Sequence, residues 1–198
     1  MINAIIFDVG MVLAEFCWKE YLESFGFKKE INERIANATV LTDTWNQFDR
    51  SEKSDDELLN DFISYEPSLK KEITMFFEQI GKSIRTYEDS NEWVKSLKKR
   101  GYKIYILSNY AEKTYIQSKE NLTFLDYVDG ALFSFQEKVI KPEPKIYQLL
   151  LERYQINPEH AVFLDDVVKN LEEAKRQGLH TIHVTNREKA KRELELLL

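Results

Sequence analysis

Five short apolar runs along the chain predict buried β-strands. They cover residues 3–9, 103–107, 131–133, 161–164 and 181–184. Each run is aliphatic or aromatic and nearly free of charge, which is typical of parallel strands that are covered on both faces. Polar residues stand at the carboxyl ends of the first, second and fourth runs, so these strand ends are the first places to look for chemistry.

The stretch between about residues 17 and 82 contains no strand candidate and shows helical spacing instead. Ser54 and Glu57 have the spacing of a capping box, and the apolar residues just after them fall on one helix face. The same spacing recurs further on, after Pro67, which suits the first turn of a helix. The helices expected here cover residues 18–25, 31–40, 55–63 and 73–80.

After Arg85 the pattern changes to an alternation of helices and strands. One helix passes through Trp93 and ends in a basic last turn followed by Gly101, which is a typical stop signal. Further helices are expected from about residue 111, from Pro144, up to Gly178, and in the charged C-terminal segment. Strands that alternate with helices imply right-handed crossovers and a parallel sheet with helices on both faces.

The expected fold class is therefore an α/β fold with a doubly wound parallel sheet. In such sheets, ligands bind beyond the carboxyl ends of the strands. Asp8, Ser108 and the pair Asp165-Asp166 stand at these ends. Because the helical stretch interrupts the alternation after the first strand, we expect it to form a cap beside the crevice. The expected domains are an α/β core, residues 1–14 and 84–198, and a helical cap, residues 15–83.

Composition narrows the class of protein. The chain has 198 residues, 43% of them hydrophobic, and a net charge of −6. It lacks the clustered Lys and Arg residues on which nucleic-acid binders depend. The one cysteine, Cys17, excludes an intrachain disulfide and a multi-cysteine metal site. No segment is long and apolar enough to span a membrane, so a cytoplasmic protein is expected.

The candidate chemistry begins with Asp8. A carboxylate at the edge of a buried strand must be compensated by a metal or a cation. Three later clusters can supply that compensation: Ser108-Asn109, Lys141 between Ile140 and Pro142, and Asp165-Asp166. In this order they indicate a magnesium-assisted phosphoryl-transfer site with Asp8 as the nucleophile.

These residues resemble the four sequence motifs of the haloacid dehalogenase superfamily, over essentially the whole chain. Residues 7–13 are similar to its first motif, residues 107–109 to its second, Lys141-Pro142 to its third and residues 164–166 to its fourth. The Asp-x-Gly opening, the stretch from Trp45 to Ser54, and Asn170 after the paired aspartates resemble a sugar-phosphate phosphatase branch. That branch is similar to glucose-1-phosphate phosphatases and to the phosphatase domain of soluble epoxide hydrolase.

The resemblance implies a Rossmann-like core and a set of roles. Asp8 would attack phosphorus and form an aspartyl-phosphate, which divides one difficult displacement into two easier ones. Mg²⁺ prefers oxygen ligands. Asp8, Asp166 and the carbonyl of Gly10 would bind it directly, and Asp165 would act through a bound water.

The remaining roles concern the charge of the phosphate. Lys141 would balance it, and the Ser108 hydroxyl and the Asn109 backbone amide would donate hydrogen bonds to phosphate oxygens. Asn170 would orient Lys141 or the surroundings of the metal. Most phosphatases of the family carry an aspartate where this chain has Gly10, and that aspartate protonates the leaving group. Its loss leaves three possibilities: substrates with better leaving groups, another group or a lid residue that moves the proton, or a slow enzyme.

Each residue also has a simpler interpretation. Asp8 alone could be a turn residue, Ser108-Asn109 a helix cap, and Lys141 a solvated lysine. Asp165-Asp166 could merely cap the next helix. Aromatic residues of the insert could line a substrate pocket but more often fill a helical core. The least specific candidates are Trp18, Tyr21 and Trp45 for the pocket and Asp49 and Arg50 for sugar contacts.

The leading hypothesis is a magnesium-dependent phosphatase that acts on a small phosphorylated metabolite, a sugar phosphate in particular, as a monomer or homodimer without nucleic-acid or membrane partners. One alternative is a 2-haloacid dehalogenase, which needs no metal and would leave Asp165-Asp166 without a purpose. The other is a binding protein that keeps the fold but has lost turnover. Gly10 favours this last alternative, whereas Asp8, Lys141 and Asp166 oppose it.

Overall fold

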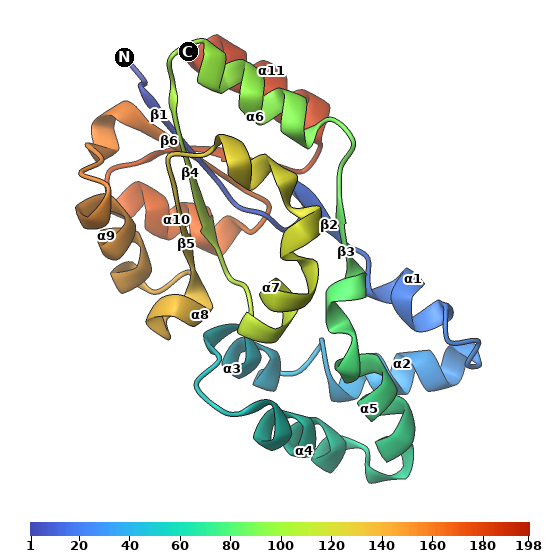
Figure 1. Ribbon diagram of the computed structural model, residues 1–198. Coiled ribbons are helices and arrows are strands. Elements are labelled where there is room, and N and C mark those ends of the chain that lie inside the picture. The colour runs from blue at the N-terminus through green and yellow to red at the C-terminus, as the bar shows by residue number, and fades with distance from the viewer.

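The computed structural model describes residues 1–198 and contains a five-stranded sheet with the order β5-β4-β1-β6-β7 (Figure 1). All four strand pairings are parallel. The chain builds the sheet outward from β1 to β4 and β5, then returns to the other side of β1 for β6 and β7. The doubly wound α/β fold is therefore confirmed. The strands are β1 Ala4–Phe7, β4 Lys103–Ser108, β5 Gly130–Phe133, β6 Ala161–Asp165 and β7 His180–His183.

The strand predicted over residues 3–9 is shorter in the structure. After Phe7 the chain leaves the ladder, and the N–H groups of Leu13 and Ala14 both donate to the carbonyl of Val9. Asp8 still donates its own N–H to the carbonyl of Leu164, at 2.9 Å. Asp8 therefore stands where the strand turns into a tight loop, at the carboxyl edge of the sheet.

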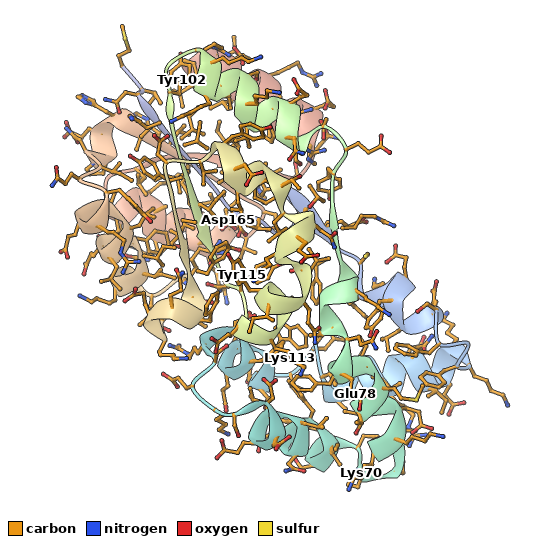
Figure 2. All side chains as sticks on the ribbon, viewed as in Figure 1. Lys70, Glu78, Tyr102, Lys113, Tyr115 and Asp165 are labelled. Carbon is orange, nitrogen blue, oxygen red and sulfur yellow. The ribbon has the colours of Figure 1, made fainter.

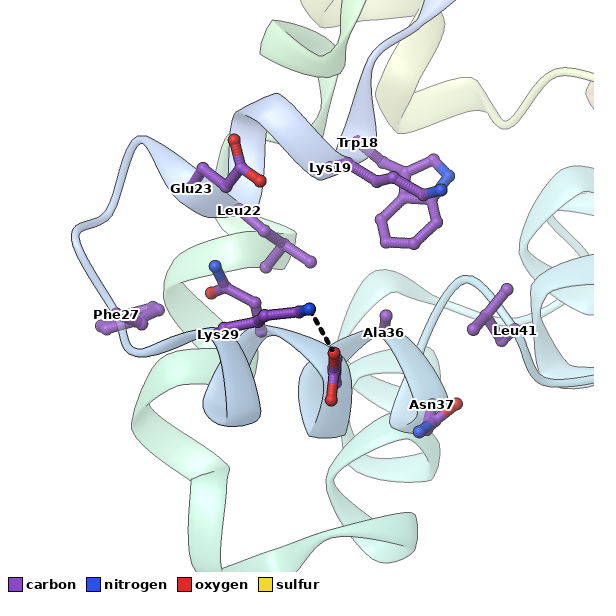
Figure 3. Close-up of a pocket in the computed structure, with 11 residues that line it drawn as sticks. Trp18, Lys19, Leu22, Glu23, Phe27, Lys29, Ala36, Asn37 and Leu41 are labelled. Atoms are coloured by element: carbon purple, nitrogen blue, oxygen red, sulfur yellow. Dashed lines mark ion pairs between the residues drawn. The ribbon is translucent and has the colours of Figure 1, made fainter.

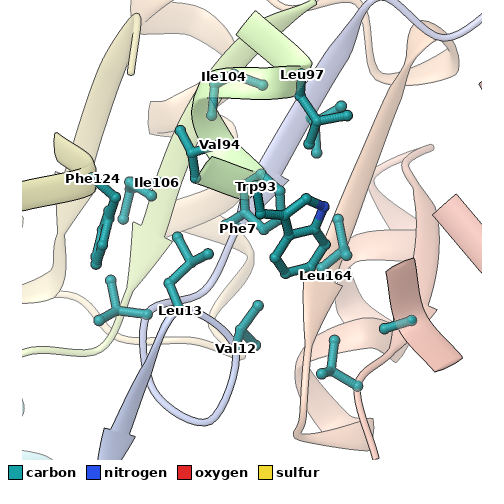
Figure 4. Packing of buried hydrophobic residues seen from close by; sticks show 14 of the residues in the cluster. Phe7, Val12, Leu13, Trp93, Val94, Leu97, Ile104, Ile106, Phe124 and Leu164 are labelled. Carbon is teal, nitrogen blue, oxygen red and sulfur yellow. The ribbon is translucent and has the colours of Figure 1, made fainter. Parts of the chain in front are cut away.

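Helices cover both faces of the sheet, because alternate side chains of each strand point to opposite sides. On one face, Trp93 of α6 packs edge-on against Phe7 of β1, with ring centroids 4.9 Å apart (Figure 4). On the other, Ile6 of β1 packs with Tyr147 of α9. The sheet helices are α6 Ser90–Lys99, α7 Glu112–Ser118, α8 Ser134–Glu137, α9 Pro144–Arg153, α10 Val168–Arg176 and α11 Arg187–Leu197, with 3-10 turns at Lys119–Asn121, Thr123–Tyr127 and Pro158–His160.

A second group of helices lies between β2 and β3 in the chain and packs around its own apolar cluster. Phe48, Phe62 and Phe77 lie at its centre, with ring centroids 5.2 to 6.4 Å apart. The capping box expected at Ser54 and Glu57 is present. These helices are α1 Trp18–Glu23, α2 Lys29–Ala38, α3 Thr44–Arg50, α4 Asp55–Tyr65 and α5 Lys70–Glu78, with 3-10 turns at Pro67–Leu69 and Ile80–Ser83.

Two short strands that the sequence pattern did not predict connect this helical group to the sheet. Strand β2, Ala14–Phe16, pairs antiparallel with β3, Ile84–Thr86, so the chain leaves and re-enters the sheet half side by side. Lys113 of α7 reaches across from the sheet half to Asp55 of α4, at 2.9 Å (Figure 2). In the whole chain, no helix has the length and apolarity that a membrane span requires.

Candidate active site

Lys141 lies between two carboxylates at the carboxyl edge of the sheet. Phe7 is opposite Leu164 in the β1–β6 pairing, so the residues that follow them, Asp8 and Asp165, are neighbours. The Nζ atom of Lys141 is 3.0 Å from Oδ1 of Asp8 and 2.6 Å from Oδ2 of Asp165. The three side chains are 1%, 10% and 0% exposed, in the order Lys141, Asp8, Asp165. Buried charges of this kind persist only when they are paired.

Both oxygens of the Asp165 carboxylate accept hydrogen bonds from within the protein. Oδ1 accepts from the N–H of Val167 at 2.7 Å, and the side-chain amide of Asn170 donates to both oxygens, at 3.1 and 3.0 Å. Asp165 therefore holds the ammonium group of Lys141, and Asn170 holds Asp165. Asn170, for which a role in orienting Lys141 or the surroundings of the metal was expected, is linked to Lys141 through the carboxylate between them.

The side chain of Asn109 fixes the backbone of Lys141. Its amide nitrogen donates to the carbonyl of Lys141 at 3.0 Å, and its carbonyl oxygen accepts from the N–H of Lys141 at 2.7 Å. The sequence suggested a role for the backbone amide of Asn109, whereas this side-chain role depends on a contact over 32 positions of sequence. Asn109 thus aims Lys141 from one side while Asp165 holds its end.

Replacing Asn109 with Ala should destabilise the protein by about 1–3 kcal/mol, because two partly buried backbone groups of Lys141 lose their partners. Urea unfolding at neutral pH measures the difference. Asn37→Ala is a suitable control, since Asn37 is exposed and makes no hydrogen bond through its side chain. A loss no larger than that of the control would contradict the clamping role of Asn109.

Three carboxylates converge at this edge. One oxygen each of Asp8, Asp165 and Asp166 lie within 4.8 Å of one another. The carboxylate of Asp166 has no hydrogen bond or ion pair with another side chain, and Oδ2 of Asp8 is also free, whereas Oδ1 of Asp8 accepts from the N–H of Val9 at 2.7 Å. Carboxylate oxygens are ligands for hard divalent cations such as Mg²⁺. The donor set fits such an ion, with Asp8 and Asp166 as the carboxylates that have free oxygens.

The combined effect of burial and the neighbouring charges raises the pKa values of Asp8, Asp166 and Lys141. Burial raises the pKa of Asp8 to about 7, against the opposing attraction of Lys141, and the carboxylates of Asp165 and Asp166 add to the rise. Burial also raises the pKa of Asp166, with Asp165 as the second cause. Burial opposes the charge on Lys141, yet the attraction of Asp165 and Asp8 outweighs it and raises the lysine pKa. A cation beside Asp8 would favour the ionised form of its carboxyl group.

Two further predicted residues lie at the same edge. Ser108 ends β4 and is buried, and its hydroxyl makes only a long contact of 3.4 Å with the carbonyl of Asn109. Gly10 lies in the loop after β1, and a Cβ atom built on it would meet nothing within 4 Å. Ser108 thus keeps a hydroxyl for another partner, and the space in front of Gly10 is open.

A cavity of about 150 Å³ occupies that space. Its walls come from both halves of the molecule: Gly10 and Asn109 from the sheet half, Phe16 from β2, and Trp45 and Asp49 from α3. Trp45 and Phe16 form an aromatic pair with ring centroids 5.6 Å apart. Of the candidates for substrate contacts, Trp45 and Asp49 line this cavity.

The other candidates lie elsewhere. Tyr21 is buried in the apolar cluster of the helical group, and Trp18 lines a separate cavity of about 600 Å³ between α1 and α2 (Figure 3). Lys29 and Glu33, 3.8 Å apart, form an ion pair in that cavity, and none of the clustered aspartates reaches it. Arg50 pairs with Glu143 and so fastens α3 to the sheet half. The larger cavity is lined by the helical group alone, whereas the cavity of about 150 Å³ includes Gly10 and Asn109, which lie next to the clustered residues in the loops after β1 and β4, and it is therefore the better candidate for the active site.

Comparison with known proteins agrees with the geometry. The family model described as haloacid dehalogenase-like hydrolase matches residues 2–178. The chain belongs to this family. Among its relatives, sesquiterpene phosphatase astK of Aspergillus oryzae is 25% identical and the match covers 93% of this chain and 90% of that protein. D-ribitol-5-phosphate phosphatase of Bacteroides thetaiotaomicron is 24% identical, with 100% and 99% covered.

This haloacid dehalogenase-like hydrolase is also similar to one segment of a longer protein. Acyl-CoA dehydrogenase family member 10 of Mus musculus is 28% identical over 99% of this chain, which spans only 19% of that protein. Among solved structures, a family enzyme of Bacteroides thetaiotaomicron in complex with magnesium and inorganic phosphate has a TM-score of 0.70 at 23% identity, with 92% of this chain and 94% of that chain covered. At this identity the likeness is one of fold.

Proposed function

We propose that this haloacid dehalogenase-like hydrolase is a magnesium-dependent phosphatase, which hydrolyses a small phosphomonoester, a sugar phosphate, through an aspartyl-phosphate on Asp8. The observation that carries the proposal is the contact of buried Lys141 with Asp8 and Asp165, beside the free carboxylate of Asp166. Lys141 is held against Asp8, and the two residues that follow Asp8, Val9 and Gly10, line the cavity, an arrangement that suits the binding of a dianionic group.

In this proposal Asp8 attacks phosphorus, and Lys141 stabilises negative charge on the phosphoryl oxygens. The hydroxyl of Ser108 and the backbone N–H of Asn109 donate further hydrogen bonds to these oxygens. Asp165 and Asn170 keep Lys141 in place, because Asp165 accepts a hydrogen bond from Lys141 and Asn170 donates to both oxygens of Asp165. Catalysis of phosphoryl transfer is mostly such positioning and charge stabilisation.

Mg²⁺ would be held by the carboxylates of Asp8 and Asp166 and by the carbonyl of Gly10, with Asp165 acting through a bound water. When bound, the ion neutralises charge and orients the phosphate oxygens. The free oxygens of Asp8 and Asp166 support this assignment.

The same proposal assigns a separate role to each of the two expected domains. Residues 1–14 and 84–198 would form the α/β core that carries the reacting groups, and residues 15–83 the cap that closes over them. The cavity of about 150 Å³ between the two is smaller than most drug-sized sites, which favours a small leaving group. The likeness to a phosphatase of D-ribitol 5-phosphate supports a sugar phosphate.

The test is hydrolysis of a panel of phosphate esters with and without Mg²⁺. We expect activity that requires the ion and disappears with a chelator. Metal-independent release of halide from a 2-haloacid would instead indicate a dehalogenase. If neither reaction occurs, the chain is a binding protein that keeps the fold.

Replacing Asp166 with Asn should raise the Mg²⁺ concentration needed for half-maximal rate by at least about tenfold, because it removes a charged ligand. Titration of the rate against Mg²⁺ measures the shift. Glu172→Gln, at an exposed position on α10, is the matched control. An unchanged Mg²⁺ requirement in the Asp166 variant would remove this residue from the metal site.

A further inference from the structure

We propose that Asp49, on α3, is the general acid and base that the position of Gly10 cannot provide. The inference rests on the proposed phosphatase function and deepens it. It starts from the juxtaposition of Gly10, which has no side chain to donate a proton, and Asp49, which lines the same cavity from the opposite half of the molecule.

Of the three titratable side chains in the wall of this cavity, Asp49 is the one without a hydrogen bond or ion pair. The other two titratable residues in its walls are Glu15 and Tyr110. Glu15 is paired with Arg85, and the hydroxyl of Tyr110 shares a hydrogen bond of 2.8 Å with Ser118. The carboxyl group of Asp49 makes no hydrogen bond and no ion pair in the structure. It is therefore free to exchange a proton with a bound molecule.

Contacts with the sheet half fix the backbone of α3 at Asp49 and Arg50. The hydroxyl of Ser134, at the start of α8, donates to the carbonyl of Asp49 at 2.6 Å and itself accepts from the N–H of Tyr110 at 2.8 Å. The adjacent Arg50 pairs with Glu143. A general acid is effective only when it is held in place, and these contacts fix the backbone that carries Asp49 in the wall of the cavity.

The surroundings of Asp49 also suit proton transfer near neutrality. Burial raises its pKa to about 7, with repulsion from Asp8 as a second cause and attraction by Lys141 as an opposing one. Tyr110 and the paired Glu15 are the other ionisable groups around the cavity. A group that titrates near the working pH can donate a proton in one step and accept one in the next.

The chemistry balances over two steps. In the first, a carboxylate oxygen of Asp8 bonds to phosphorus and the bond from phosphorus to the leaving oxygen breaks. That oxygen keeps the electron pair and takes the proton of Asp49, so an alcohol leaves. In the second, water attacks phosphorus, the bond to Asp8 breaks, and the carboxylate of Asp49 takes the proton of the water. Inorganic phosphate forms and both aspartates return to their first states.

The test is the variant Asp49→Asn with two substrates, an alkyl ester such as glycerol 2-phosphate and an aryl ester, p-nitrophenyl phosphate. The alkyl leaving group needs the proton, so we expect its kcat/KM to fall by about 10²–10⁴-fold. The aryl leaving group departs as an anion, so its kcat/KM should fall much less. Since the second step also slows, the aspartyl-phosphate should accumulate in the variant.

The pH profile gives a second readout. Asp49 must be protonated to donate, so the wild-type kcat/KM for the alkyl ester should fall as the pH rises through about 7. This limb should be absent in Asp49→Asn. The double variant Gly10→Asp/Asp49→Asn should recover at least about tenfold of the lost alkyl activity, because it restores an acid at the open position in front of Gly10.

Stability separates loss of function from loss of fold. The folded pKa of Asp49 lies above its ordinary value of 3.8, so the ionised carboxyl destabilises the folded state increasingly as the pH rises from 3.8 to about 7. The urea midpoint of Asp49→Asn at pH 8 should therefore exceed that of the wild type. Asp43→Asn, exposed at the N-cap of the same helix, should change neither rate nor midpoint.

The outcomes are distinguishable. An equal loss for both esters, or an unchanged alkaline limb, would overturn the role of Asp49 while leaving the phosphatase function standing. Failure of the wild type to hydrolyse any phosphate ester would overturn both.

Discussion

Replacement of Asp8 with Asn is expected to lower phosphate-ester turnover by at least about a thousandfold, because an amide cannot attack phosphorus in place of the carboxylate. Asn has nearly the same shape, and Lys141 keeps its second partner, Asp165, at 2.6 Å. The fold should therefore survive. Steady-state rates with saturating Mg²⁺, together with the unfolding transition of the same sample, measure both effects.

Asp126→Asn is the control for this change, since Asp126 is exposed on the sheet half, away from the carboxylate cluster. It should keep the wild-type rate. An Asp8→Asn protein that folds and still turns over at the wild-type rate would refute the assignment of Asp8 as nucleophile.

Lys141→Met is expected to have the largest effect on stability. The lysine side chain is 1% exposed and contacts Asp8 and Asp165, so its removal leaves two buried carboxylates without their cation. Breaking a buried pair in this way costs about 3–5 kcal/mol. Activity should fall as well, because the phosphate loses its positive partner. Urea unfolding at neutral pH measures the stability loss, and Lys145→Met, exposed on α9, is the matched control.

The stability loss of Lys141→Met should depend on pH. The pKa of Asp8 is raised to about 7 even with Lys141 present, and without the lysine it should rise further. A carboxyl group whose pKa is higher in the folded state stabilises that state most at low pH and loses this contribution as the pH rises. The deficit due to this carboxyl group should therefore be smallest below about pH 7 and should grow as the pH rises above about 7, where Asp8 is ionised in the wild type but still protonated in the variant. A deficit that stays constant as the pH rises through about 7 would show that the carboxylates are not its cause.

The sequence pattern was sufficient for the sheet, because its strands are continuous apolar runs that end in polar residues. Those ends predicted that Asp8, Ser108 and Asp165 would meet at one edge, since the carboxyl ends of parallel strands lie together. Lys141 follows no strand, and only the resemblance to the family assigned it to the same site. Its roles, like those of the other site residues, remain predictions that the variants above would test.

The pattern of hydrophobic and polar residues did not predict the short strands and helices. Strands β2 and β3 have three residues each, and α8 has four, so no periodicity can develop in them. Helix α3 has seven residues, about two turns, which is too short for a clear helical periodicity even though Asp43 stands at its N-cap. These elements exist because of tertiary packing, which a local pattern does not record.

Two contacts of the site were equally invisible in the sequence. The clamp of Asn109 on Lys141 and the approach of Asp49 to Gly10 both join distant parts of the chain. Asp49 was noted only as a possible sugar contact, because nothing beside it in the sequence indicates burial near another carboxylate. The sequence feature that could have directed attention to Asp49 is Gly10. It stands where most phosphatases of the family carry the proton-donating aspartate, so another residue has to supply the acid.

The central claim is that a phosphoryl group passes onto Asp8, and trapping that intermediate tests it most directly. Wild-type protein with Mg²⁺ and excess phosphate ester would be quenched with acid during turnover, digested and analysed by mass spectrometry. We expect a phosphoryl group on the peptide that contains Asp8 and none on this peptide in the Asp8→Asn protein. Turnover with phosphate on another residue, or with no covalent phosphate at any time, would contradict the claim.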